Sequence, residues 1–179
     1  MSPPDLHKNF FQLFDLPVDF VLDQGHLGEC YRKLQGQLHP DRFSSAPEHE
    51  QRMAVQYSAL VNEAYATLRR PLTRALYLLE LAGLDEKDIA GQQIDGGFLI
   101  MQMDLREKLE SMAELVEPDP VLDHVVTEIN GDIGQQQGLF IQEYRDGNYN
   151  EAAAACVKMQ YLDKLLREAE QIESDLMDN

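Results

Sequence analysis

Hydrophobic residues recur at helical spacing through most of this chain, and no segment alternates between hydrophobic and polar residues as a half-buried strand does. The first long helical pattern covers residues 23–38, where Asp23 is a suitable N-cap. Its hydrophobic residues are separated by four, three and four positions, which places them on one face of a helix: Leu27, Tyr31, Leu34 and Leu38. A shorter helix is expected before it, over residues 10–14.

A second long helix is predicted over residues 47–70, after a polar loop. Pro40 ends the preceding helix, because proline lacks an amide donor and restricts the residue before it. Pro47 fits the first turn of the new helix, and Pro71 follows its end. The two helices therefore form an antiparallel hairpin, onto whose tip Phe43 is expected to fold back. The hydrophobic face of the second helix comprises Met53, Tyr57, Leu60, Val61, Ala64 and Leu68.

Four further helices are predicted, over residues 72–81, 98–117, 121–145 and 151–176. Segment 85–97 contains three glycines and is expected to be a linker. The last three helices have short connections and form a natural antiparallel bundle. The sequence thus predicts an all-α protein with an N-terminal module over residues 1–84 and a three-helix bundle over residues 98–179.

The formal charge of −17 is concentrated in the second half of the chain. Residues 1–84 contain 8 basic and 10 acidic side chains, whereas residues 85–179 contain 7 and 22. This asymmetry indicates two modules that face different partners. An acidic bundle argues against a nucleic-acid partner, whose phosphates require cations. No hydrophobic run reaches the length of a membrane span, so no membrane partner is expected either.

The two cysteines, Cys30 and Cys156, are far apart and neither belongs to a CxxC pair. This pattern predicts a reducing, cytoplasmic environment with no disulfide scaffold, metal site or cofactor. The five histidines are scattered, and no nucleophile motif or phosphate-binding loop is present, so no catalytic residue is assigned. Two alternatives stay open: a helical enzyme that uses His39 and Asp41 as a catalytic pair, and a metal or iron–sulfur carrier, which two isolated cysteines disfavour.

The tripeptide His39-Pro40-Asp41 stands at the predicted tip of the hairpin. Before it lies a basic helix, and after it come Arg42-Phe43, then Asn62-Glu63-Ala64-Tyr65, Leu68 and Pro71. In this order the segments resemble a J domain over about residues 9–84. The resemblance implies docking on a DnaK-type chaperone and stimulation of its ATPase, with no hydrolysis by this chain. The implied chaperone-binding residues are Arg32, Lys33, His39, Pro40, Asp41 and Arg42.

The rest of the chain is similar to the HscB family of J-domain co-chaperones. The similarity is carried by residues 71–79 with Gly83, by Phe98-Leu99, by Leu105-Arg106-Glu107 and by residues 162–165. Two departures from the family lie in the first long helix, at Gly36 and Leu38. The resemblance implies a co-chaperone of iron–sulfur cluster biogenesis that brings the scaffold protein IscU to the DnaK-like chaperone HscA. A J-domain co-chaperone for a different client is the alternative.

The helix predicted over residues 98–117 has more hydrophobic residues than one buried face needs. A core stripe runs through Phe98, Met101, Leu105, Leu109, Met112 and Val116. It leaves Leu99, Ile100 and Met103 on adjoining faces. An exposed hydrophobic patch of this kind often marks an interface, although packing against the J domain or in a wide bundle core is the alternative. The resemblance assigns scaffold binding to Leu99, Ile100, Met103, Asp104, Glu107 and Tyr161, with Ser111 where the family often has an acid.

Overall fold

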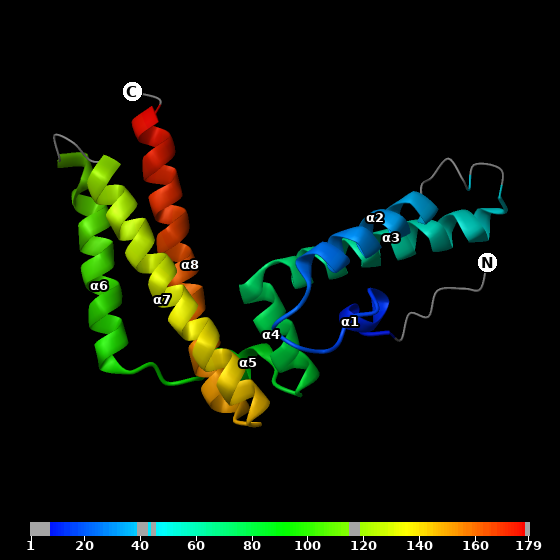
Figure 1. Cartoon of the computed structure of the whole chain (residues 1–179), viewed down its shortest axis with the longest axis horizontal. Coiled ribbons are helices and arrows are strands. Elements are labelled where there is room, and N and C mark those ends of the chain that lie inside the picture. Colours follow the sequence, from blue (N-terminus) through cyan, green and yellow to red (C-terminus); the bar gives the residue numbers. More distant parts are fainter. Residues whose placement is uncertain (1–7, 39–42, 44–45, 115–118, 178–179) are drawn as a thin grey trace. The chain divides into compact units, whose positions relative to one another are not determined.

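The computed structural model describes residues 8–38, 43, 46–114 and 119–177, and over these residues the protein contains helices and no strand (Figure 1). The all-α prediction is therefore confirmed. The helices are α1 (Phe10–Leu13), α2 (Gln24–Leu38), α3 (Glu48–Arg69), α4 (Pro71–Leu81), α5 (Glu86–Ala90), α6 (Gly96–Glu110), α7 (Asp119–Arg145) and α8 (Tyr149–Met177), with a 3-10 turn, η2, over Ser111–Glu114.

The chain divides into two compact units, residues 1–78 and 79–179, and the division falls within α4. The sequence placed the end of the first module at residue 84. The segment predicted as a linker, 85–97, contains α5, which the sequence analysis missed. Asp85 caps this helix by accepting from the amides of Lys87 and Asp88, and the Asp88 side chain accepts from the Asp85 amide in return. Ile89 is buried, and α5 packs against α8.

In the first unit, α2 and α3 lie side by side as the predicted hairpin (Figure 1). Asp23 caps α2 as expected, since its carboxylate accepts from the amide of His26 at 3.0 Å. Leu27 and Leu38 of α2 are buried on the side that the helical spacing predicted. From α3, the buried residues are Ala54, Val61, Ala64 and Leu68.

The second unit contains a bundle of α6, α7 and α8 (Figure 1). Its buried core draws on all three helices and comprises Phe98, Leu105, Leu109, Met112, Leu122, Val125, Ile129, Leu162, Leu165 and Ala169. Gly147, at a φ of 78°, supplies the left-handed residue in the turn between α7 and α8. The three long helices predicted for this half are therefore present.

The boundaries of α6 differ from the predicted range of 98–117. The helix begins at Gly96 because Asp95 caps it, with its carboxylate accepting from the Phe98 amide at 2.9 Å. It ends at Glu110, where the Ser111 hydroxyl donates to the carbonyl of Lys108 at 2.8 Å and the chain tightens into η2. Val116, which the sequence analysis placed in the core stripe, lies outside the described residues.

Candidate functional site

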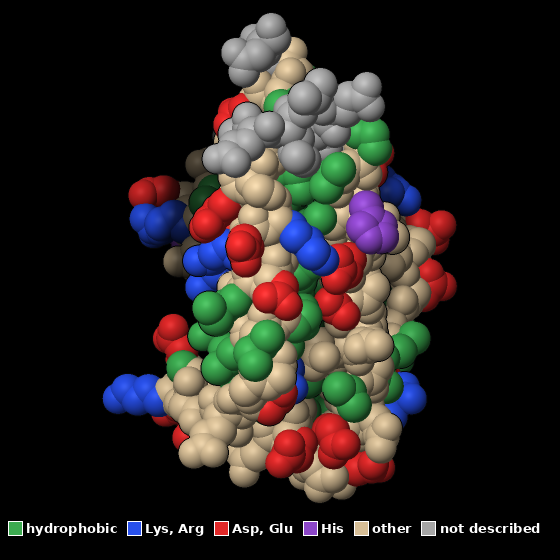
Figure 2. Space-filling view, turned by 90° about the vertical axis from the view of Figure 1, so that its left-hand side faces the viewer, with side chains coloured by type: hydrophobic (Ala, Val, Ile, Leu, Met, Phe, Trp, Pro, Cys, Tyr) green, Lys and Arg blue, Asp and Glu red, His purple; other side chains and the backbone are tan. Residues whose placement is uncertain are grey.

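Four large hydrophobic side chains lie exposed on two neighbouring helices of the bundle. Leu99, Ile100 and Met103 project from α6 with exposed fractions of 39%, 63% and 66%, and Tyr161 projects from α8 with 38%. We call these four residues the apolar patch. Figure 2 shows hydrophobic side chains gathered low on the bundle, with carboxylates beside them. Because they are exposed, these residues are not part of the bundle's own core.

The exposure of the patch follows from how α6 fills the core. Phe98, Leu105 and Leu109 are buried and already occupy the face of α6 that meets the other helices. Successive residues of a helix are about 100° apart, so Leu99 and Ile100 point away from that face. The patch is therefore a surplus of hydrophobic side chains that the fold of this unit does not use.

The patch is held between the helices by an aromatic contact. The ring of Phe98 meets that of Tyr161 edge to face, with centroids 6.3 Å apart. This geometry is favourable because the positive ring edge faces the negative ring face. The Lys164 ammonium lies 5.7 Å from the centroid of the Tyr161 ring. Tyr161 is thus oriented by a buried neighbour from α6 and by a cation from its own helix.

Two carboxylates predicted to belong to the site, Asp104 and Glu107, are exposed on α6. Asp104 follows Met103 directly, and Glu107 lies one helical turn further on, so both can border the patch. Ser111 stands another turn along, where its hydroxyl is engaged by the backbone of Lys108. The surface that α6 presents is therefore hydrophobic near its start and charged toward its end, where the cations Arg106 and Lys108 are exposed beside these carboxylates.

In the first unit, the predicted chaperone-binding residues fall in two groups. Arg32 and Lys33 are exposed on α2. The remaining four, His39, Pro40, Asp41 and Arg42, lie outside the described residues. The described part of the hairpin next to them is well braced, because Tyr31 stacks on Tyr65 with centroids 3.9 Å apart. The Tyr31 hydroxyl also donates to Asn62 at 3.0 Å, and Gln35 donates to the same oxygen.

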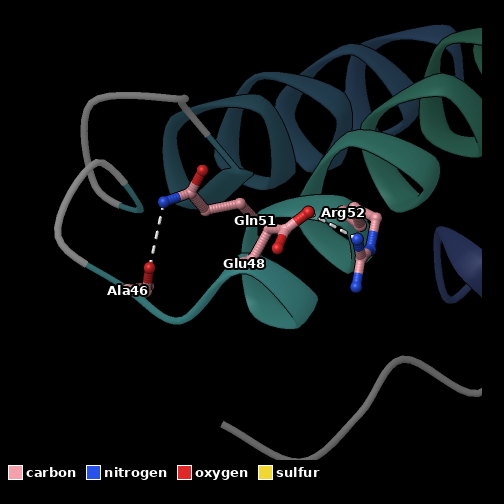
Figure 3. A network of polar contacts seen from close by, with 4 residues as sticks. All are labelled: Ala46, Glu48, Gln51 and Arg52. Atoms are coloured by element: carbon pink, nitrogen blue, oxygen red, sulfur yellow. Dashed lines mark hydrogen bonds and ion pairs between the residues drawn. The ribbon is translucent and has the colours of Figure 1, made fainter.

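Polar contacts fix the start of α3 after the loop (Figure 3). Gln51 donates from Nε2 to the carbonyl of Ala46 at 2.9 Å, and Arg52 pairs with Glu48 at 2.7 Å.

An open groove of about 400 Å³ lies between α2 and α3. Its walls include Leu38, Phe43, Ala54 and Val55. Phe43 is half-buried there, which agrees with its predicted return onto the hairpin.

The described residues contain no group of three His, Cys, Asp or Glu side chains that could hold a metal ion, and neither cysteine forms a disulfide there. Cys156 is fully buried, and burial raises the pKa of its thiol to about 12. Cys30 is half-buried, with its sulfur 3.5 Å from Nε2 of His26. No helix within the described segments is long and apolar enough to span a membrane.

Comparison with known proteins places the whole chain in one family. A family model described as the HSCB C-terminal oligomerisation domain matches residues 94–170. The co-chaperone protein HscB homolog of Shewanella loihica is 38% identical over 171 residues, which cover 94% of this chain and 99% of the relative.

Two solved structures are also similar over nearly their full length. The chaperone HscB from Vibrio cholerae has a TM-score of 0.85 and 36% identity, covering 94% of this chain and 99% of that one. The human co-chaperone protein HscB has a TM-score of 0.87 and 28% identity, covering 97% and 86%. From these full-length similarities, the chain belongs to the HscB family of co-chaperones.

Proposed function

We propose that this co-chaperone binds an IscU-type iron–sulfur scaffold protein on its bundle, presents it to an HscA-like chaperone of the DnaK type, and stimulates the ATPase of that chaperone. The observation that carries the proposal is the apolar patch. In a member of the HscB family, the patch offers a hydrophobic surface on an otherwise acidic bundle. It spans α6 and α8, and α6 also bears the carboxylates Asp104 and Glu107.

The patch has the features of a protein-binding surface. Burial of its hydrophobic side chains against a partner would contribute roughly 25 cal/mol of favourable free energy for each Å² of apolar surface removed from water. Asp104 and Glu107 add charge at the border, where electrostatic complementarity favours a partner with cationic groups and orients it. The partner we propose for this surface is the scaffold protein, with contacts from Leu99, Ile100, Met103, Asp104, Glu107 and Tyr161.

The chaperone side of the proposal rests on the J-domain segments. Arg32 and Lys33 present cations on the exposed face of α2, which suit an acidic chaperone surface. His39, Pro40, Asp41 and Arg42 follow at the end of that helix in the sequence. In this proposal they contact the chaperone and change its rate of ATP hydrolysis, so the chemistry takes place in the partner.

Joining the two activities in one chain has a simple physical benefit. A scaffold bound to the bundle remains tethered to the chaperone-binding module, which raises its effective concentration near the chaperone. The scaffold can then reach the chaperone without any increase in the intrinsic affinity of the two proteins for each other.

The decisive experiment measures ATP hydrolysis by an HscA-like chaperone with this chain, with and without an IscU-type scaffold, together with calorimetric titration of scaffold into this chain. We expect stimulation by the chain, a further increase with scaffold, and saturable scaffold binding. Stimulation without scaffold binding would support the alternative, a J-domain co-chaperone for a different client. Absence of both would refute the proposal.

A further inference from the structure

One carboxylate, that of Asp95, joins two helices of the bundle at the edge of the apolar patch. Its Oδ1 accepts from the amide of Phe98 at 2.9 Å and so caps α6. Its Oδ2 lies 2.6 Å from Nζ of Lys158, which comes from α8. The two oxygens thus contact different helices, and the start of α6 is joined to the first half of α8.

Lys158 is more enclosed than the cations of two other interhelical pairs in the same unit. Its side chain is 20% exposed, whereas those of Arg106 and Lys108 are 46% and 44% exposed. The Lys158 ammonium also lies 5.5 Å from the centroid of the Phe98 ring. The Asp95 side chain is 60% exposed, so the pair gains from the enclosure of Lys158 and its cation–π contact rather than from burial of both partners.

The first turn of α6 has little helical stability of its own. Gly96 and Gly97 open it, and glycine is about 1 kcal/mol less favourable than alanine in a helix interior. An ideal Cβ on Gly96 would meet no atom within 4 Å, so packing does not require a glycine there. The order of this turn therefore depends strongly on the contacts that Asp95 makes.

Both halves of the apolar patch adjoin these contacts. On α6, Leu99 and Ile100 directly follow Phe98, whose amide is bound to Asp95. On α8, Tyr161 stands three residues after Lys158, which places the two on neighbouring positions of one helical face. The Asp95–Lys158 pair therefore adjoins the patch on both helices.

We infer that Asp95 and Lys158 are positioning residues for the partner-binding surface, which hold the first turn of α6 against α8 so that the apolar patch is ordered before the partner arrives. The inference rests on the proposed function and extends it to two residues outside the predicted contact set. Ordering the turn in advance spares the complex the entropy of ordering it on binding. In this role neither side chain needs to touch the partner.

The test uses the full chain and an IscU-type scaffold in calorimetric titrations. Asp95→Asn keeps an acceptor for the helix cap but loses the charge, and Lys158→Met keeps the apolar stem over Phe98. We expect each single variant to raise the Kd for the scaffold about fivefold. The Kd of the double variant should be no higher than that of the weaker-binding single variant, because both substitutions remove the same interaction. Glu168→Gln is the matched control: it breaks the 3.1 Å pair with Arg106 between the same two helices and should leave the Kd unchanged.

A second substitution separates positioning from direct contact. Gly96→Ala should restore helical order to the first turn in the Asp95→Asn variant, and we expect it to recover most of the lost affinity. Loss of affinity without this recovery would overturn the positioning role, since it would mean that the carboxylate itself binds the partner.

The double variant Leu99→Ala, Tyr161→Ala distinguishes failure of the inference from failure of the proposed function. If that variant binds weakly but Asp95→Asn and Lys158→Met bind like the natural protein, the positioning role is wrong and the binding site stands. If none of these variants alters the Kd, the site lies elsewhere and both proposals fall.

Discussion

The guanidinium carbon of Arg74 lies 4.7 Å from the centroid of the Phe20 ring, and both side chains are only 5% exposed. The same guanidinium donates from its NH1 group to the carbonyl of Leu68 at 2.6 Å. This carbonyl belongs to the last turn of α3, where backbone acceptors have no partner within the helix. Burial lowers the pKa of Arg74, because it disfavours the charged guanidinium. The Phe20 ring and the Leu68 carbonyl offset this cost, and the hydrogen bond also satisfies an acceptor at the end of α3.

Arg74→Met should therefore destabilise the first unit. We expect a loss of about 2 kcal/mol, because a charge-assisted hydrogen bond and a cation–π contact disappear and a buried carbonyl is left without its donor. Hydrogen exchange of the α3 amides measures this loss within the first unit alone. Arg52→Met is the control, since that exposed side chain pairs across one turn with Glu48 and should change stability by less than about 0.5 kcal/mol. Equal losses for the two variants would contradict the role given to Arg74.

His39→Gln tests the predicted chaperone-binding turn. We expect the variant to lose stimulation of the chaperone ATPase while keeping its helical content and its affinity for the scaffold, because the substitution removes one contact residue from the J-domain motif. His49→Gln, on the exposed start of α3, is the control and should stimulate normally. A His39→Gln protein that stimulates fully would remove the basis for assigning this turn to the chaperone.

The sequence predicted most helices because each buries one face at regular spacing. It also identified Leu99, Ile100 and Met103 as surplus to the core of α6, since Phe98, Leu105 and Leu109 already supply a complete buried stripe. Their contact with a scaffold protein remains a prediction from family resemblance. The contact of His39, Pro40, Asp41 and Arg42 with a chaperone likewise remains a prediction from family resemblance.

Two features of the structure could not be predicted from the sequence, one because local signals compete and the other because it joins distant residues. Helix α5 was missed because the glycines of segment 85–97 outweighed the short capping pattern of Asp85 and Asp88. The pairing of Asp95 with Lys158 joins residues 63 positions apart, and no helical period encodes such a contact. Only the packing of α6 on α8 brings these two side chains together.

The two thiols should differ in reactivity. Thiolate is the reactive form of cysteine, and burial raises the pKa of Cys156 to about 12. We expect a thiol reagent such as Ellman's reagent to label one cysteine per chain in the native protein and both after unfolding in urea. Cys30→Ala should abolish the native reaction, whereas Cys156→Ala should leave it unchanged. Labelling of native Cys156 at the rate of Cys30 would be incompatible with its burial.

Asp95 should make the start of α6 sensitive to acid. The hydrogen bond from Lys158, with a second from the Phe98 amide, lowers the pKa of Asp95 below its ordinary value. A carboxylate with a lowered native pKa stabilises the fold above the ordinary aspartate pKa of about 3.9, and that contribution is lost as the pH falls through the native pKa. Carbon-detected NMR titration should give a higher Asp95 pKa in Lys158→Met than in the natural protein. Identical values would show that the pair does not form in solution.

Three glycines in the middle of α7 offer a direct test of helix stability. Gly131, Gly134 and Gly138 are exposed, and an ideal Cβ built on any of them meets no atom within 4 Å. Replacing each with alanine should stabilise the bundle by about 0.5–1 kcal/mol, because alanine loses less backbone entropy on forming a helix. Gly147→Ala provides the opposite control: its φ of 78° disfavours any side chain, so stability should fall. Urea unfolding of each variant gives the comparison. A loss of stability in Gly134→Ala would mean that this face of α7 packs more tightly than the space around its backbone indicates.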